Sequence, residues 1–140
     1  MGATTVWERW NSVLPDGLVS DTGMNSMNHY AYGAIVEWMY RYMCGLNPVE
    51  DRPGFKFARI QPFTDARFEY AKATYDSASG LYECGWQRTA DGVIYDVTVP
   101  FDCEADFVPE CDGAWTLDGE SVDSGTIRLL PGRHRLVCKK

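Results

Sequence analysis

A carboxylate between two tryptophans is the first feature of the sequence that could carry chemistry. Glu8 lies in Trp7-Glu8-Arg9-Trp10, at the end of residues 2–10 (GATTVWERW). Aromatic faces pack on the C–H groups of sugar rings, and a nearby carboxylate can take a proton from a hydroxyl or a water. The alternative is a surface Glu8–Arg9 pair beside two core tryptophans. The pattern alone leaves both interpretations open.

A second polar cluster precedes a long apolar stretch. Residues 24–33 read MNSMNHYAYG and include Asn28 and His29. At the start of a buried helix, such side chains can line the mouth of a site. Alternatively, Asn25 or Ser26 caps the helix by accepting a bond from a free backbone N–H, and His29 is a hydrogen-bonded core residue. We expect one of these two caps in either case.

The remaining titratable candidates are interpreted as structural. Glu37 lies eight residues after His29, about 12 Å along a helix axis, which is too far to share a proton or a metal ion. We therefore expect Glu37 to pair with Arg41, four residues on. His134 is expected to face solvent. The sequence contains no GxSxG, HExxH, P-loop or GxGxxG motif.

One strong helix is predicted over about residues 26–44, with Gly45 as the residue that ends it. Its apolar residues cover nearly every face, as in helices buried among other helices. Yet no second helix is predicted anywhere in the chain. The helix therefore indicates a truncated protein in which its neighbours are missing.

Short strands and dense turns follow from residue 55 onward. Residues alternate in polarity along the stretches that contain Trp86 and Tyr95, and Ala90-Asp91-Gly92 is predicted to join them as a hairpin. A final pair of strands is expected around Pro131-Gly132. Seven or eight such strands predict a mainly β fold, an antiparallel β-sandwich of Greek-key or jelly-roll type. The domain boundary is placed between residues 52 and 53. The aromatic residues of this part are interpreted mainly as its core.

Composition excludes several classes of function. The net charge is −7 and no segment is strongly basic, which argues against nucleic-acid binding. The apolar stretch 30–42 is interrupted by charges and too short to cross a membrane, and residues 1–5 do not resemble a signal peptide. The five cysteines lack zinc-type spacing, and no cofactor is predicted. Their odd number favours buried free thiols and slightly favours the cytoplasm, with a Cys103–Cys111 bridge as the minor alternative.

These motifs carry a resemblance to a known family. Residues 2–10 and 24–33 resemble the GATT-[IV]-WERW and MNSxNHYAYG segments of family 78 α-L-rhamnosidases, and parts of residues 53–81 resemble the start of their C-terminal β domain. The resemblance covers about residues 2–100. It implies that residues 1–52 are the remnant of an (α/α)₆ catalytic barrel, whose last helix follows Asn25. Residues 53–140 would form the C-terminal β-sandwich.

The resemblance also implies roles for individual residues. Glu8 matches the general base of inverting hydrolysis, and His29 matches a histidine that contacts rhamnose. Trp7, Trp10 and Asn28 are expected to support the substrate. The family's general acid lies far upstream, in a segment absent from these 140 residues. The chain by itself is therefore expected to be inactive.

Two further classes of function remain open from the sequence. The β part could bind carbohydrate without catalysis, in which case Trp86 or Trp115 would form an exposed platform. It could also be purely structural. The partners implied by the resemblance are rhamnose-containing glycosides bound by the full-length enzyme. The exposed apolar helix is expected to make the fragment associate with itself.

Overall fold

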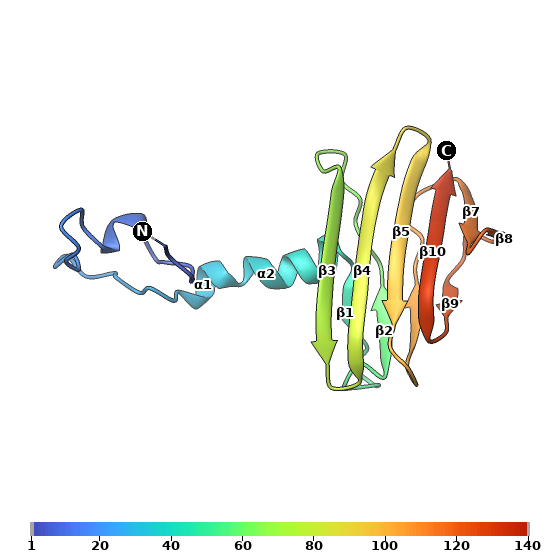
Figure 1. Ribbon diagram of the computed structural model, residues 1–140, viewed down its shortest axis with the longest axis horizontal. Helices are drawn as coiled ribbons and strands as arrows, with labels where there is room; N and C mark the ends of the chain where they lie inside the picture. The colour runs from blue at the N-terminus through green and yellow to red at the C-terminus, as the bar shows by residue number, and fades with distance from the viewer. Residues whose placement is uncertain (1, 140) are drawn as a thin grey trace. The chain divides into compact units, whose positions relative to one another are not determined.

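The computed structural model describes residues 2–139 of the chain. They pack as two compact units that divide between Trp38 and Met39, and each unit is described by itself. Figure 1 shows the ribbon with most of the helices and strands labelled. Within residues 2–139, no helix is long and apolar enough to cross a membrane.

The first unit consists of loops and short helical segments. They are η1 (Trp10–Ser12), α1 (Tyr30–Gly33) and α2 (Ile35–Trp38). An isolated bridge between Val13 and Val19 closes the loop that follows η1. Ser20 closes the same loop further, because its backbone N–H donates to the carbonyl of Ser12 at 2.9 Å.

The predicted start of the helix is wrong. Helical structure begins at Tyr30 rather than near residue 26, and His29 takes the capping position without a side-chain hydrogen bond. Asn25 does not cap the helix because its side chain is bonded elsewhere. Its amide N–H donates to the carbonyl of Ser20, and its amide oxygen accepts from Arg9. The backbone of Ser26 is likewise bonded to Glu8. These contacts hold residues 25–26 in the loop.

The second unit begins with the helical turn η2 (Met39–Met43) and continues into ten strands. The strands are β1 (Leu46–Pro48), β2 (Phe57–Ile60), β3 (Tyr70–Ser77), β4 (Gly80–Thr89), β5 (Gly92–Val99), β6 (Glu104–Phe107), β7 (Ala114–Leu117), β8 (Glu120–Val122), β9 (Ile127–Leu129) and β10 (Gly132–Lys139). One sheet has the order β1-β2-β6-β9 and the other has the order β3-β4-β5-β10-β7-β8. All neighbouring pairs among these strands are antiparallel except β2 and β6.

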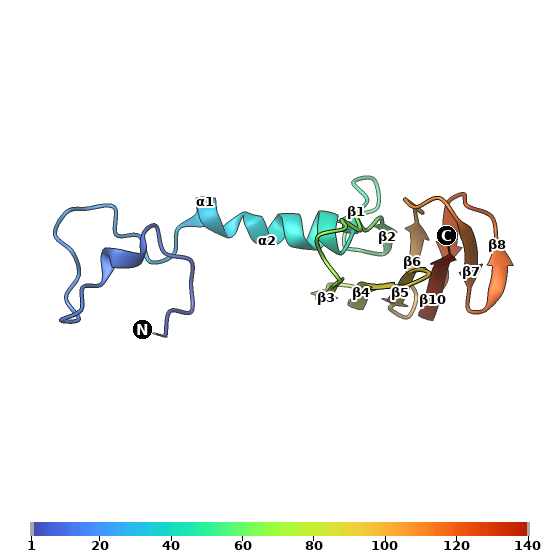
Figure 2. The same ribbon diagram turned by 90° about the horizontal axis from the view of Figure 1, so that it is seen from above.

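The two sheets face each other across one hydrophobic core. Figure 2 shows them as two layers. Tyr95 of the six-stranded sheet packs edge-on against Phe107 of the four-stranded sheet, with ring centroids 5.1 Å apart, and stacks on Trp115 at 5.5 Å. Both sheets contribute fully buried side chains to this cluster. The predicted mainly β sandwich is therefore confirmed, as is the β4–β5 hairpin with its alternating buried side chains.

The predicted final strand pair is corrected by the structure. β9 and β10 both form, with Leu129 and Leu136 fully buried, but β9 pairs with β6 and β10 pairs with β5 and β7. Pro131 therefore lies where the chain crosses from one sheet to the other. Inward-facing residues alternate in the same way in both sheets, so the pattern could not show which sheet each strand joins.

The structure tests the predictions for the cysteines and for His134. The five cysteines are free thiols, four of them buried, so the Cys103–Cys111 bridge is wrong. His134 does not simply face solvent. Its Nδ1 lies 3.0 Å from a carboxylate oxygen of Asp118, its Nε2 lies 2.7 Å from the carbonyl oxygen of Leu130, and only 14% of its side chain is exposed.

The helical turn η2 is attached to the sandwich through its last carbonyl groups. The indole N–H of Trp86 donates to the carbonyl of Met43 at 2.7 Å, and the thiol of Cys84 contacts the carbonyl of Cys44 at 2.7 Å. The hydroxyl of Tyr40 donates a hydrogen bond to the backbone carbonyl of Thr74 in β3 at 3.2 Å. The carbonyls that a helix leaves unsatisfied at its end are thus bonded by inward-facing sheet residues.

Candidate functional site

The two polar segments of the first unit lie side by side. The N–H of Glu8 donates to the carbonyl of Ser26 at 2.8 Å, and the N–H of His29 donates to the carbonyl of Val6 at 2.8 Å. The hydroxyl of Thr5 also donates to the carbonyl of Met27. The structure therefore brings together the two segments that the sequence analysis singled out, although about twenty residues separate them.

The Glu8 carboxylate is held at one of its two oxygens. Its Oε2 accepts a hydrogen bond from the backbone N–H of Ser26 at 3.2 Å. No hydrogen bond to Oε1 is found within residues 2–139. The side chain is half-buried. A carboxylate fixed at one oxygen and open at the other is suited to accept a proton from a water.

Arg9 ties the loop of the first unit together. Its Nη2 donates to the hydroxyl of Ser20 at 2.9 Å, to the side-chain oxygen of Asn25 at 3.0 Å, and to the hydroxyl of Thr22. Ser20 is itself buried. Arg9 is thus a positioning residue for the loop that carries its neighbour Glu8. Its guanidinium bonds Ser20, Thr22 and Asn25 instead of forming the surface pair with Glu8 that the sequence had left open.

Replacing Arg9 with alanine is expected to loosen the loop. Removing the guanidinium leaves Ser20 and Asn25 without its charge-assisted hydrogen bonds, at a cost of about 1–3 kcal/mol. Amide hydrogen exchange would then speed up by roughly tenfold or more at Ser20 and Glu8. Arg67→Ala is the matched control, because Arg67 pairs with Asp65 in the other unit. Equal exchange rates in the Arg9 variant and the parent would contradict the role of Arg9.

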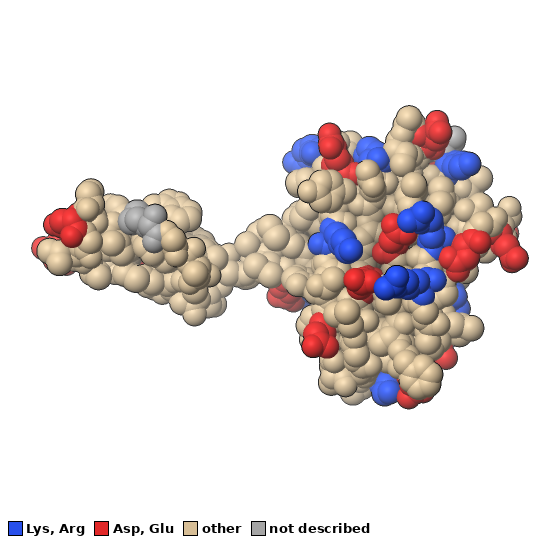
Figure 3. Space-filling model, viewed as in Figure 1, with Lys and Arg blue, Asp and Glu red and all other residues tan. Residues whose placement is uncertain are grey.

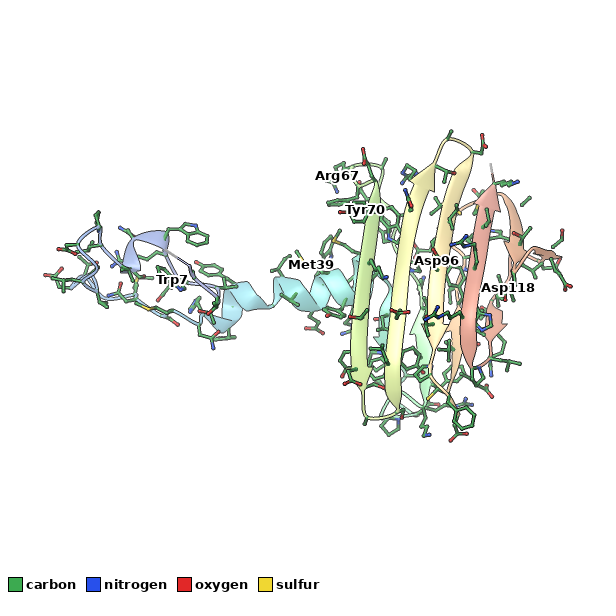
Figure 4. All side chains as sticks on the ribbon, in the orientation of Figure 1. Trp7, Met39, Arg67, Tyr70, Asp96 and Asp118 are labelled. Carbon is green, nitrogen blue, oxygen red and sulfur yellow. The ribbon has the colours of Figure 1, made fainter. Side chains whose placement is uncertain are left out.

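The other predicted site residues lie on the same two segments. The ring of His29 lies 5.0 Å from that of Tyr32, and Trp7 is half-buried. Trp10 is 77% exposed in η1, and Asn28 is exposed as well. Trp10 is therefore not a core residue. Figure 4 labels Trp7 among the side chains of this unit.

Sequence reasoning missed Ser20 and Thr22, which bond Arg9. Hydroxyl residues in a polar loop give no signal in sequence, because their partner is defined only by the fold. Within residues 2–139, no group of three His, Cys, Asp or Glu side chains is arranged to hold a metal ion.

Comparison with known proteins divides the chain at the end of η2. Residues 1–43 match the bacterial alpha-L-rhamnosidase 6 hairpin glycosidase domain, and residues 45–116 match the bacterial alpha-L-rhamnosidase C-terminal domain. These two matches place the chain among glycoside hydrolases, as part of a six-hairpin glycosidase domain with a β domain after it. The chain belongs to the bacterial α-L-rhamnosidase family.

Individual relatives agree with this assignment. The α-L-rhamnosidase of Alteromonas sp. (strain LOR) is 44% identical over 108 residues, which are 77% of this chain and 12% of the relative. That of Formosa agariphila is 34% identical over 139 residues, or 97% of this chain and 15% of the relative. The crystal structure of Streptomyces avermitilis α-L-rhamnosidase complexed with L-rhamnose matches with a TM-score of 0.75 and 32% identity. That match covers 99% of this chain and 14% of the solved one. The chain thus spans less than a sixth of each of these proteins.

Proposed function

We propose that this chain supplies the general base, Glu8, to an inverting α-L-rhamnosidase whose other catalytic parts lie in a longer protein. The observation that carries the proposal is the state of the Glu8 carboxylate. It is anchored by the Ser26 N–H and keeps one oxygen unbonded within residues 2–139. It also lies where two segments of the family's glycosidase domain pair with each other.

The reaction assigns one proton transfer to each of two carboxyl groups. Glu8 takes a proton from the attacking water as the water's oxygen bonds to the anomeric carbon from the side opposite the leaving group. A carboxylic acid outside this chain protonates the departing glycosidic oxygen. Inverting enzymes hold the two groups roughly 6.5–9.5 Å apart to leave room for the water. The substrate class is a terminal α-L-rhamnoside, and the product would be the β-anomer.

The remaining site residues support the substrate rather than transfer protons. We assign contact with the rhamnose to the ring of His29, and support of the substrate to Trp7, Trp10 and Asn28. We assign residues 1–43 to the catalytic domain and the sandwich from β1 onward to a β domain, because β1 pairs with β2 in its four-stranded sheet. The β domain has a structural role and performs no proton transfer of its own.

The chain alone is expected to release no nitrophenol from a nitrophenyl α-L-rhamnoside. It lacks the general acid and most of the wall that would bind the sugar, so Glu8 has no oriented substrate on which to act. The assay compares it with a complete family member at equal molar concentration. Turnover by the 140-residue chain, above that of a Glu8→Gln control, would show that the missing acid has a substitute within it.

We propose further that the chain associates with itself through residues 30–38 of the first unit. Five large apolar side chains are exposed there, namely Tyr30, Tyr32, Ile35, Val36 and Trp38. Exposed apolar side chains in this number favour association. Light scattering is expected to give a dimer or larger species, and replacing Ile35 and Trp38 with lysine should shift it toward monomer. A monodisperse monomer of the unaltered chain would contradict the proposal.

A further inference from the structure

The outer face of the six-stranded sheet carries an exposed aromatic residue beside a glycine. Tyr70 of β3 pairs with Gln87 of β4, and Lys72 pairs with Gly85, which in turn pairs with Asp96 of β5. Neighbouring residues on these strands point into the core, so these five residues share the outward face. Tyr70 is 68% exposed. Figure 4 labels Tyr70 on β3 and Asp96 on β5, two strands away.

A hollow lies in this face around Gly85. The hollow is about 250 Å³ in volume and is bounded by Tyr70, Lys72, Gln87 and Asp96. A Cβ atom added to Gly85 would lie 3.2 Å from Cγ of Lys72, so the lysine stem covers the glycine and forms one wall of the hollow. Drug-sized sites measure roughly 300–1,000 Å³, so this hollow suits one small ring.

Charges of both signs lie around the hollow. Arg135 forms an ion pair with Asp96 at 2.8 Å, and the carboxylate of Glu83 accepts a hydrogen bond from the uncharged hydroxyl of Thr98 at 2.8 Å. These residues line a second hollow of about 560 Å³ that shares Lys72 and Asp96 with the first. Figure 3 shows both signs of charge side by side across this face. Such a surface favours neither an anion nor a cation, yet it is rich in hydrogen-bond donors and acceptors.

We propose that this face binds a neutral pyranoside, with the sugar ring packed on Tyr70 in this hollow. The ring face of tyrosine covers the C–H groups of the sugar, and the aliphatic stem of Lys72 adds apolar contact beside it. Sugar hydroxyls then bond the amide of Gln87, the ammonium of Lys72 and the carboxylate of Asp96. Trp86 and Trp115 cannot serve as the platform, because each is 3% exposed and packs in the core. The proposal does not depend on Glu8.

The test is a titration of the isotope-labelled chain with methyl α-L-rhamnopyranoside, followed by amide chemical shifts. A parallel titration uses methyl β-D-glucopyranoside. Binding of millimolar affinity should shift the amides of residues 70–72, 85–87 and 96. Tyr70→Ala is expected to weaken binding at least about fivefold, and Gln87→Ala about threefold. Both changes are on an exposed face, so the sandwich should stay folded.

Phe101→Ala is the matched control, since Phe101 is an aromatic residue that is 91% exposed outside this face. Its binding curve should equal that of the parent chain. No shifts on the sheet with either sugar at about 100 mM, far above millimolar dissociation constants, would overturn the proposal. Shifts confined to residues 4–30 would also overturn it, because they would place the sugar in the first unit. Sheet shifts that persist unchanged in Tyr70→Ala would remove the assigned platform and overturn it as well.

Discussion

Alanine at position 45 is expected to cost the sandwich more than about 4 kcal/mol of unfolding free energy. Gly45 follows the last helical turn with φ of +76°, a conformation that costs an L-residue roughly 1–2 kcal/mol. Its added Cβ would also lie 2.1 Å from the backbone nitrogen of Pro62. Backbone atoms cannot move aside as a flexible side chain can. The strand pairing between Leu46 and Ile60, which starts at this point, would have to shift.

The contact with Pro62 can be separated from the backbone conformation. Gly54 has a similar φ of +79°, but a Cβ added there meets no atom within 4 Å. Gly54→Ala is therefore expected to cost only the conformational part, about 1–2 kcal/mol. Urea unfolding followed by fluorescence of the buried Trp86 and Trp115 compares the two variants. If both lost the same stability, the close approach of Gly45 to Pro62 would not hold in solution.

The role of Gly45 was visible in the sequence only in part. A glycine after an apolar helical stretch predicts the helix end, and the positive φ agrees with that prediction. The approach of Pro62 could not be predicted, because it depends on how β1 pairs with β2. The same limit applies to Pro131. The alternation of buried residues predicted strands on both sides of it, but the exchange of sheets depends on tertiary packing.

The candidate site shows the same division between local pattern and tertiary contact. The types and spacing of residues selected Glu8, His29 and their segments, and the fold does bring these segments together. The helix start was misplaced, however, because Asn25 looked like a cap and instead bonds Ser20 and Arg9. Propensity ranks asparagine as a good cap but cannot reveal a competing partner sixteen residues away.

The apolar helical stretch predicted that its neighbours in the fold are missing from this chain. Its residues cover nearly every face, and the structure leaves several of them exposed, Tyr30 by 87%. A complete domain would be expected to bury such side chains. Among the described residues from 55 onward the structure has nine strands, against the expected seven or eight.

Glutamine at position 8 is expected to abolish rhamnoside hydrolysis in a complete enzyme that contains this chain. The amide has nearly the same size, and its oxygen can still accept the hydrogen bond from the Ser26 N–H. It cannot take a proton from the attacking water, however. General bases contribute about 10²–10⁴ to the rate, so kcat should fall by at least about a hundredfold. That loss corresponds to roughly 3 kcal/mol or more of transition-state stabilisation.

Binding should separate this catalytic role from a structural one. L-Rhamnose affinity, measured by calorimetry, is expected to change less than about threefold in Glu8→Gln, because removal of a group that acts only in the transition state lowers kcat alone. Asp16→Asn is the matched control. Asp16 is an exposed carboxylate of the same loop, and its replacement keeps an oxygen that can accept from Leu18.

Comparing kcat with rhamnose affinity decides whether Glu8 is the general base or a structural residue. Equal losses of kcat and of rhamnose binding in Glu8→Gln would mean that Glu8 stabilises the loop and does not act as the general base. In that case Arg9→Ala should produce the same pattern, since Arg9 bonds three residues of that loop. A large loss of kcat with rhamnose binding preserved assigns the proton transfer to Glu8, because the Ser26 contact survives in the glutamine variant and only basicity is removed.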